Sequence, residues 1–187
     1  MEVYLIRHTK PLLTPGLIYG HLEVELAAGL ETELDNIRSQ LPIHFDAVYS
    51  SPSTRCTLLA KAINPNYRVD ERLRELHFGD WEGKTWDTVD QADLKFWMED
   101  FVNVRIPGGE SMLDLKGRVE DFFTILNHSP DEKIAIVTHG GVIRLLLTLL
   151  ADKPLHQCFE MKVDYASVFK IDRLSTDRIY SSNANRV

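Results

Sequence analysis

Two short apolar runs in this chain each end at a histidine. Residues 4–8 read Tyr-Leu-Ile-Arg-His, and residues 134–140 read Ile-Ala-Ile-Val-Thr-His-Gly. Continuous apolar runs rich in β-branched residues are typical of buried strands in an α/β sheet that is covered by helices on both faces. Ligands of such sheets bind beyond the carboxyl ends of the strands. We therefore expect His8 and His139 to meet at one sheet edge, where Arg7 adds a positive charge suited to an anion.

The remaining apolar pattern predicts a three-layer α/β/α sandwich with a mostly parallel central sheet and a small helical lid. Further strands are expected at 45–50, 67–69, 166–171 and 178–180. Apolar residues at helical spacing predict helices over 26–41, closed by Pro42, over 112–126, capped by Ser111, and over 142–150, which is apolar almost all round. Residues 9–25, rich in Pro, Gly and Tyr, are expected to form a long loop over the sheet edge.

A helix-start signal follows the second expected strand. In Ser50-Ser51-Pro52-Ser53, Ser51 is the expected N-cap and Pro52 takes the first helical position. Arg55 then lies in the opening turn. An anion near that turn would interact with its guanidinium and with the unpaired N–H groups of the helix end.

Residues 85–101 predict a helical excursion from the sheet, which we interpret as a lid. This stretch combines several acids with Trp86, Val89, Phe96, Trp97 and Phe101. Aromatic residues at helical spacing usually form the core face of their own helix, and that interpretation is favoured here over a role in binding. No linker or composition shift divides the chain. We expect a single domain over 1–187 with the lid inserted around 80–110.

Composition narrows the function classes. A formal net charge of -7 argues against a general nucleic-acid surface, which needs clustered Lys and Arg. The chain shows no secretory leader pattern, and its longest apolar stretch contains Arg144 and is shorter than the about 20 residues that span a bilayer. A cytoplasmic location without a membrane partner is the expectation. Cys56 and Cys158 lack CxxC or metal-ligand spacing and are interpreted as buried small hydrophobes.

Five residues that can carry chemistry lie at predicted strand ends or helix starts. They are Arg7 and His8, Arg55 after Ser50-Ser51-Pro52, Glu75 in Leu-Arg-Glu-Leu-His-Phe-Gly-Asp-Trp-Glu-Gly, and His139 in Thr-His-Gly-Gly-Val-Ile-Arg. In this order and spacing the motifs resemble the histidine phosphatase superfamily, also called phosphoglycerate-mutase-like, over nearly the whole chain.

The resemblance implies a role for each of these residues. His8 would be the nucleophile, which takes the phosphoryl group onto a ring nitrogen as a phosphohistidine that water then hydrolyses. Glu75 would be the proton donor, and Arg7, Arg55 and His139 would bind the phosphate. Positive charge on these phosphate-binding residues, with His139 protonated, would keep His8 neutral and stabilise the transition state. Plainer alternatives are hydrogen-bonded structural histidines, a solvated carboxylate at Glu75 and a surface arginine at Arg55.

The motifs depart from the commonest pattern of the family directly after the first histidine. Thr9 replaces the usual glycine, and Lys10-Pro11 stand in place of an acidic-threonine pair, which affects the shape of the loop rather than the nucleophile. After His139, the pair Gly140-Gly141 would let the backbone approach a ligand closely. Arg144 could be an inner salt-bridge partner or a substrate contact, and it stays unassigned, as does Glu110.

Three further segments, 78–82, 107–111 and 162–167, are similar to the α-ribazole-5′-phosphate phosphatase branch of the family, which acts in cobalamin synthesis. The resemblance implies a phosphomonoesterase that acts on a small-molecule phosphate ester, and aromatic side chains of the lid would stack against the flat ring of this ester. No metal or other cofactor is expected, because the His, Asp and Glu residues lack HExxH or comparable ligand spacing. A broad-specificity sugar or nucleotide phosphatase and a small phosphoglycerate mutase remain open. From another class, so does a non-catalytic module that binds a phospho-ligand. The sequence predicts no oligomeric state.

Overall fold

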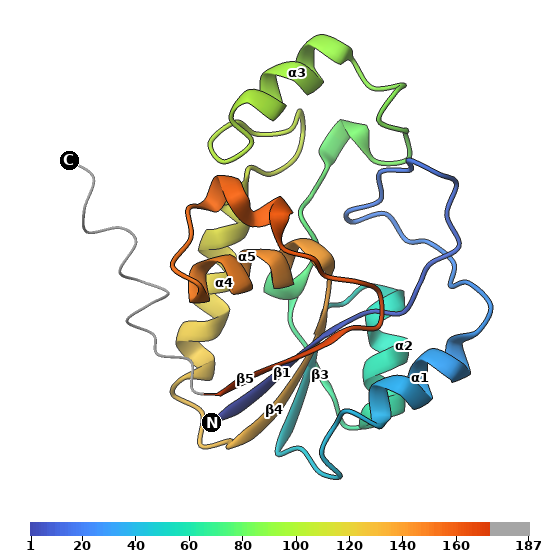
Figure 1. Cartoon of the computed structure of the whole chain (residues 1–187), viewed down its shortest axis with the longest axis vertical. Helices are drawn as coiled ribbons and strands as arrows, with labels where there is room; N and C mark the ends of the chain where they lie inside the picture. Colours follow the sequence, from blue (N-terminus) through green and yellow to red (C-terminus); the bar gives the residue numbers. More distant parts are fainter. Residues whose placement is uncertain (173–187) are drawn as a thin grey trace.

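The two apolar runs that end at histidines lie side by side in the middle of one sheet. The structure, a computed structural model, describes residues 1–172, and within them the strand order is β3-β2-β4-β1-β5 (Figure 1). The strands are β1 (Glu2–Arg7), β2 (Ala47–Ser50), β3 (Arg68–Val69), β4 (Lys133–Thr138) and β5 (Val168–Asp172). All neighbours are parallel except β5, which runs antiparallel to β1. The strand expected at 178–180 lies outside the described residues.

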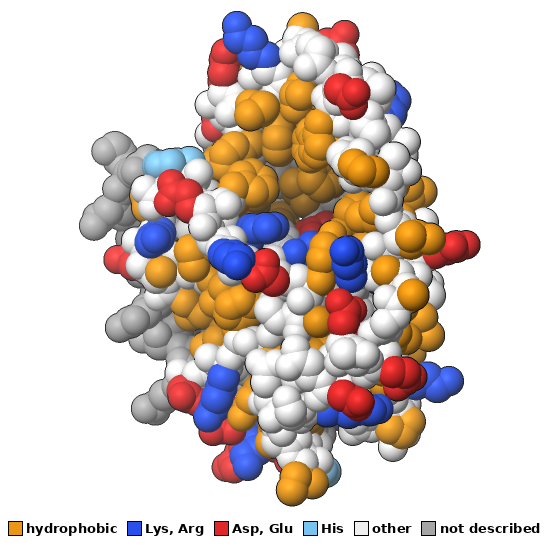
Figure 2. Space-filling view, turned by 45° about the vertical axis from the view of Figure 1, so that its right-hand side comes forward, with side chains coloured by type: hydrophobic (Ala, Val, Ile, Leu, Met, Phe, Trp, Pro, Cys, Tyr) orange, Lys and Arg blue, Asp and Glu red, His pale blue; other side chains and the backbone are white. Residues whose placement is uncertain are grey.

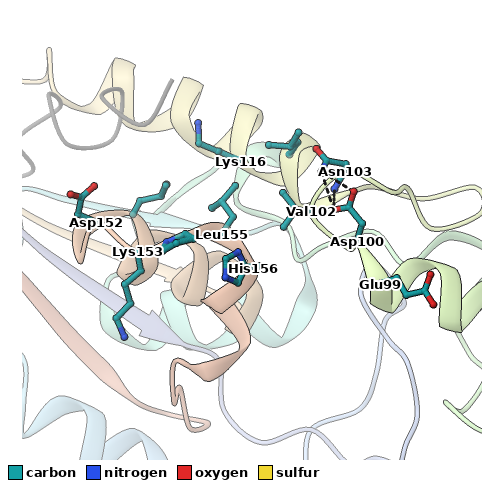
Figure 3. A pocket seen from close by; sticks show the side chains of 12 residues that line it. Glu99, Asp100, Val102, Asn103, Lys116, Asp152, Lys153, Leu155 and His156 are labelled. Atoms are coloured by element: carbon teal, nitrogen blue, oxygen red, sulfur yellow. Dashed lines mark hydrogen bonds between the residues drawn. The ribbon is translucent and has the colours of Figure 1, made fainter. Parts of the chain in front are cut away.

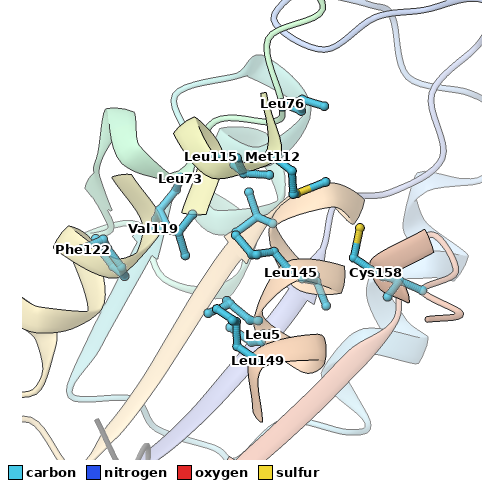
Figure 4. Close-up of a cluster of buried hydrophobic side chains, with 14 of the residues drawn as sticks. Leu5, Leu73, Leu76, Met112, Leu115, Val119, Phe122, Leu145, Leu149 and Cys158 are labelled. Carbon is cyan, nitrogen blue, oxygen red and sulfur yellow. The ribbon is translucent and has the colours of Figure 1, made fainter. Parts of the chain in front are cut away.

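Helices cover both faces of this sheet, as the uninterrupted apolar strands require. The α-helices of the described part are α1 (Leu30–Arg38), α2 (Thr54–Ile63), α3 (Gln91–Glu99), α4 (Met112–Leu126) and α5 (Gly140–Leu150). Along β1, Val3 and Leu5 pack into a cluster with α4 and α5, whereas Tyr4 and Ile6 pack with α1 and α2. Figure 4 shows the first cluster, in which Leu5 lies close to Leu145 and Leu149 of α5. The predicted mixed α/β fold with a mostly parallel sheet is confirmed.

The first helix begins one turn later than the apolar spacing predicts. Leu26 pairs with Pro11 in an isolated β-bridge, and Gly29 then turns the chain with a φ of 96°. This left-handed conformation favours glycine and cannot continue into a regular helix from the N-terminal side. The helix therefore starts at Leu30, and it ends at Arg38, before Pro42.

The helix predicted over 85–101 is shorter in the structure. Its N-cap is Asp90, whose carboxylate accepts hydrogen bonds from the backbone N–H groups of Ala92 and Asp93, so α3 covers only Gln91–Glu99. The interpretation of its aromatics as a common core face was wrong for two of them. Trp86 precedes the helix, and Phe96 is 63% exposed on it.

The expected start of α4 is confirmed. The Ser111 hydroxyl accepts a hydrogen bond from the backbone N–H of Asp114, whose carboxylate accepts one from the backbone N–H of Ser111. This capping box satisfies two helix-end donors and typically contributes about 1 kcal/mol. None of the helices within residues 1–172 is long and apolar enough to cross a bilayer.

The long loop over 9–25 is fixed against a distant segment. Leu17 pairs with Thr85 in a β-bridge, the Ile18 N–H donates to the Lys84 carbonyl at 2.9 Å, and the Gly83 N–H donates to the Ile18 carbonyl at 2.8 Å. These backbone contacts connect the loop after β1 to the segment that follows Glu75. As a result, two stretches far apart in sequence face the same end of the sheet (Figure 1).

Candidate active site

The register between β1 and β4 brings the two histidines together. Arg7 is paired with Thr138 at the carboxyl ends of these adjacent parallel strands, so the next residues, His8 and His139, are neighbours. Their ring centroids are 5.2 Å apart and the planes meet at 64°. Both side chains are buried at the sheet edge.

His8 is held as a neutral imidazole, and within residues 1–172 its Nε2 makes no hydrogen bond. Its Nδ1 lies 2.8 Å from the Thr9 carbonyl oxygen, and because a carbonyl only accepts, Nδ1 carries the proton. Burial lowers the pKa of His8 to about 3, helped by the charges of Arg55 and Arg7 and opposed by the bond to Thr9. The lone pair of Nε2 is therefore available for attack near pH 7.

His139 is neutral as well, which corrects the expectation that it is protonated. Burial, followed by the proximity of His8 and Arg55, holds the pKa of His139 well below its usual range. Its Nε2 lies 2.7 Å from the Ser51 hydroxyl and 3.5 Å from the Cys56 sulfur. The positive charge at this site therefore comes from the arginines.

Ser51 has a different place from the one predicted. The N-cap position of α2 is Ser53, while the Ser51 hydroxyl contacts His139. The first N–H of α2, that of Thr54, donates to both carboxylate oxygens of Glu23 at 3.0 and 3.2 Å. An anion at this helix end would have to compete with Glu23, so the helix N-terminus is a weaker anion site than the sequence indicated.

Arg55 and Arg7 each direct part of a guanidinium to backbone carbonyls. Arg55, fully buried, donates from Nη1 to Leu22 at 2.9 Å and from Nη2 to Gly20 at 2.7 Å. Arg7 donates from Nη1 to Val163 at 2.7 Å. Within residues 1–172, the buried Nε atoms of both arginines have no hydrogen-bond partner. Buried donors are rarely left unpaired, and an anion between the arginines would satisfy them.

Glu75 is fixed against the start of α5. Its carboxylate oxygens accept hydrogen bonds from the Gly141 N–H at 3.0 and 3.1 Å, and one also accepts from the Leu76 N–H at 3.0 Å. A Cβ at Gly141 would lie only 2.2 Å from Glu75 Oε1, and one at Gly140 would lie 3.2 Å from the Arg7 guanidinium. The two glycines thus leave room for side chains of the site itself, rather than for direct approach to a ligand.

Two tyrosines that the sequence reasoning missed lie over the arginines. The hydroxyls of Tyr19 and Tyr165 are 2.6 Å apart. The Arg7 guanidinium lies 3.8 Å from the Tyr165 ring centre, and that of Arg55 lies 5.2 Å from the Tyr19 ring centre. Because the tyrosines are 146 residues apart in sequence, only the folded loops reveal their pairing.

Two residues left unassigned at the sequence level have structural partners. Arg144 donates from Nε to the Met161 carbonyl at 3.1 Å. Glu110 is paired with Arg118 at 2.9 Å, and its other oxygen accepts from the His77 N–H at 3.0 Å. Thr9, at the departure from the family pattern, is buried, and within the described chain its hydroxyl has no hydrogen-bond partner.

Aromatic side chains form a cluster, here called the aromatic rim, that consists of Trp86, Trp97, Phe101 and Phe159. Ring centres are 6.3 Å apart for Trp86 and Trp97, 6.4 Å for Trp97 and Phe159, and 4.8 Å for Phe101 and Phe159. Trp86 and Phe159 are 38% and 48% exposed. Figure 2 shows hydrophobic side chains gathered around a hollow in the upper half of the view, with Lys and Arg side chains along its lower edge.

A separate cavity of about 590 Å³ lies between the end of α3, α4 and residues 152–156 (Figure 3). Its wall carries both signs of charge, with Lys116 and Lys153 opposed by Asp100 and Asp152. Of the described residues that line it, none belongs to the histidine site. This cavity is therefore distinct from the candidate active site.

Comparison with known proteins defines the class to which this site belongs. The family model of the histidine phosphatase superfamily (branch 1) matches residues 3–186, so the chain belongs to this superfamily. Enzymes of this superfamily are phosphatases, which are hydrolases that act on small phosphorylated substrates.

The names of individual relatives refer to different substrates. The chain is 27% identical to adenosylcobalamin/alpha-ribazole phosphatase of Escherichia coli, covering 98% of this chain and 97% of the relative. It is 25% identical to phosphoserine phosphatase 1 of Hydrogenobacter thermophilus, covering 89% and 84%. The crystal structure of the alpha-ribazole phosphatase from Shigella flexneri superposes with a TM-score of 0.83 at 28% identity, covering 94% and 92%.

Proposed function

We propose that this protein is a phosphomonoesterase that works through a phosphohistidine on His8, with α-ribazole 5′-phosphate as its substrate. The observation that carries the proposal is a neutral imidazole with a free Nε2, buried beside two guanidiniums whose Nε donors lack partners in the described chain. A phosphate monoester supplies the electrophile for the imidazole and acceptor oxygens for the arginines.

In the first step, the lone pair of His8 Nε2 forms a bond to phosphorus as the bond from phosphorus to the ester oxygen breaks. Protonated Glu75 gives its proton to the leaving alkoxide, which departs as an alcohol. Positive charge that develops on the ring is stabilised because Nδ1–H donates to the Thr9 carbonyl. Arg7 and Arg55 stabilise the phosphoryl oxygens.

In the second step, water attacks phosphorus and the bond from Nε2 to phosphorus breaks. The carboxylate of Glu75 takes the proton of the water, which restores the acid for the next cycle. Inorganic phosphate leaves, and His8 returns to its neutral form. The proton that Glu75 gives to the leaving group in the first step is thus recovered from water in the second.

Preference for α-ribazole 5′-phosphate is supported by the aromatic rim and by the names of two relatives. Residues 80–110 would act as a lid whose exposed Trp86 stacks against the flat ring of the substrate, which contributes about 1 to 3 kcal/mol. The rim is connected to segments that also contain or contact residues of the site. Trp86 contacts Phe78, three residues after Glu75, and Phe159 precedes the segment that binds Arg7.

Phosphoserine phosphatase activity is the second candidate, and the Hydrogenobacter relative favours it. Phosphoserine carries the same phosphate ester but no flat ring, so the rim would contribute little to its binding. The ratio of kcat/KM for the two substrates therefore separates the candidates.

A substrate panel tests the proposed function. The panel contains α-ribazole 5′-phosphate, phosphoserine, phosphoglycerates, sugar phosphates and 4-nitrophenyl phosphate, all in chelator-treated buffer. We expect the highest kcat/KM for α-ribazole 5′-phosphate and no turnover by His8→Ala. His44→Ala, at an exposed histidine before β2, is the matched control. Activity retained by His8→Ala would exclude the mechanism, and tight phosphate binding without turnover would favour a non-catalytic module.

A further inference from the structure

The backbone of Glu75 is held as firmly as its carboxylate. Its carbonyl oxygen accepts one hydrogen bond from Arg118 Nη2 at 2.8 Å and another from His21 Nε2 at 2.9 Å. Arg118 belongs to α4, and His21 belongs to the loop after β1. Two distant elements therefore converge on the main chain of the proposed proton donor, at the opposite end of the residue from its contact with Gly141.

His21 lies between the two residues that Arg55 binds. The guanidinium donates to the carbonyl of Gly20 on one side and to that of Leu22 on the other. The backbone N–H of His21 also donates to Glu82 at 2.7 Å. Because Arg55 is fully buried and bonded on both sides of His21, it fixes the backbone of the stretch 20–22 and the position of the His21 ring.

The ring of His21 is oriented by its neighbours as well. It stacks on His77 with centroids 4.4 Å apart at an angle of 29°. Since a carbonyl only accepts, His21 uses Nε2–H to reach Glu75. Gly20 allows this approach, because a Cβ there would lie 2.1 Å from the Leu76 carbonyl oxygen.

From this geometry we propose that His21 is a positioning residue for Glu75. Through Arg55 and the stretch 20–22, His21 connects the phosphate-binding arginines to the proton donor. The inference rests on the proposed function, since it assumes that Glu75 protonates the leaving group. Loss of the His21 bond frees one side of the Glu75 carbonyl, so the carboxylate shifts relative to the ester oxygen. Displacements near 1 Å can cost about 100-fold in rate.

The leaving group reveals whether His21 acts through Glu75. An alkoxide is strongly basic and needs a proton as the ester bond breaks, whereas 4-nitrophenolate is weakly basic and leaves without one. Glu75 also acts in the second step, which all esters share, so the comparison uses kcat/KM, which reports the first step alone. A variant that misplaces the acid should therefore lose kcat/KM on alkyl esters and keep it on 4-nitrophenyl phosphate. A variant that merely loosens the fold would lose activity on both.

The test compares His21→Leu, which lacks a donor, with His21→Gln, whose amide can reach the same carbonyl. The kcat and KM of each are measured with 4-nitrophenyl phosphate, phenyl phosphate and phosphoserine. For His21→Leu we expect kcat/KM on phosphoserine to fall about 10- to 100-fold, and kcat/KM on 4-nitrophenyl phosphate to fall less than about 3-fold. His21→Gln should recover most of the loss. His44→Gln, at an exposed histidine outside this network, should leave the dependence on leaving group as in wild type.

Equal losses on all three esters, or no recovery in His21→Gln, would overturn the inference while wild-type turnover keeps the proposed function intact. A wild-type protein that hydrolyses none of the esters would overturn both. Far-ultraviolet circular dichroism of the variants checks that they are folded. If His21→Leu does not fold, His21→Ala takes its place in the same comparison with His21→Gln.

Discussion

The floor of the site and the aromatic rim are built in different ways. The floor consists of His8, Arg55 and His139, each no more than 1% exposed and each attached to a strand end or to the first turn of α2. The rim consists of side chains from α3, from the segments on either side of it and from the segment after α5, and two of its members are 38% and 48% exposed. A rigid floor suits chemistry that every ester shares, while an exposed rim suits contacts that distinguish one ester from another.

The two regions also differ in their electrostatics. Burial keeps both histidines of the floor neutral and leaves Arg7 and Arg55 as the cations, in a medium where charge interactions are stronger than in water. The rim is uncharged and contributes by stacking. Variants of the floor should therefore lower kcat for all substrates, and variants of the rim should raise KM for some of them.

Arg55→Ala should have the largest effect of the floor variants after His8. We expect kcat/KM to fall about 100- to 1,000-fold for every ester, because a buried donor to the phosphoryl oxygens is lost. Urea unfolding should also show lower stability, since the carbonyls of Gly20 and Leu22 lose their donor. Arg105→Ala, at a side chain 68% exposed, is the control. A loss below 10-fold would remove Arg55 from the phosphate site.

Gly141→Ala should displace the carboxylate of Glu75 and leave the phosphate-binding arginines in place. The new methyl would lie 2.2 Å from Glu75 Oε1, so the carboxylate must move, and we expect kcat to fall about 100-fold. Gly117→Ala is the matched control, because a Cβ there meets nothing within 4 Å and the residue lies on an exposed face of α4. That change should leave kcat intact and stabilise the fold by about 0.5 to 1 kcal/mol. Equal kcat in both variants would contradict the placement of Glu75.

Trp86→Ala tests whether the rim selects the substrate. We expect KM for α-ribazole 5′-phosphate to rise about 10-fold, with little change for phosphoserine, because only the former offers a ring to stack. Phe96→Ala, at a residue 63% exposed on α3, should change neither value. If KM rises equally for both substrates, the rim is structural rather than selective.

The pH dependence of stability should show the smallest effect. The lowered pKa values of His8 and His139 mean that, below about pH 6.5, the unfolded chain binds protons that the folded protein does not. Each histidine should therefore make the free energy of unfolding about 1 kcal/mol lower at pH 5.5 than at pH 7.

His8→Gln should remove one of these two contributions. Urea unfolding at pH 7.0, 6.0 and 5.5, compared between this variant and wild type, measures the difference. The same pH dependence in both proteins would mean that His8 is not a buried neutral group.

The sequence predicted the floor better than the rim, and the reason is physical. Apolar strands that end at His8 and His139 predict side chains at one sheet edge, since parallel strands share the direction of their carboxyl ends. The cap at Ser111 is equally local and was predicted correctly. By contrast, the role of Ser51 was missed, because its contact with His139 depends on the pairing of β2 with β4.

Contacts between loops could not be predicted from local pattern. Tyr19 and Tyr165 meet only because the loop after β1 and the segment before β5 both fold over Arg7 and Arg55. The length of α3 was overestimated, since the cap at Asp90 competes with an apolar spacing that continues on either side of it. Protonation of His139 was wrong because burial depth cannot be read from sequence.

The most direct test of the account is to identify the residue that carries the phosphoryl group. Wild-type protein is mixed with excess substrate, quenched in alkali within milliseconds, and digested for mass spectrometry under conditions that preserve phosphohistidine. The account predicts phosphate on the peptide that contains His8, and no phosphorylated peptide from His8→Ala. Phosphate on another residue, or labelling that persists in His8→Ala, would contradict it.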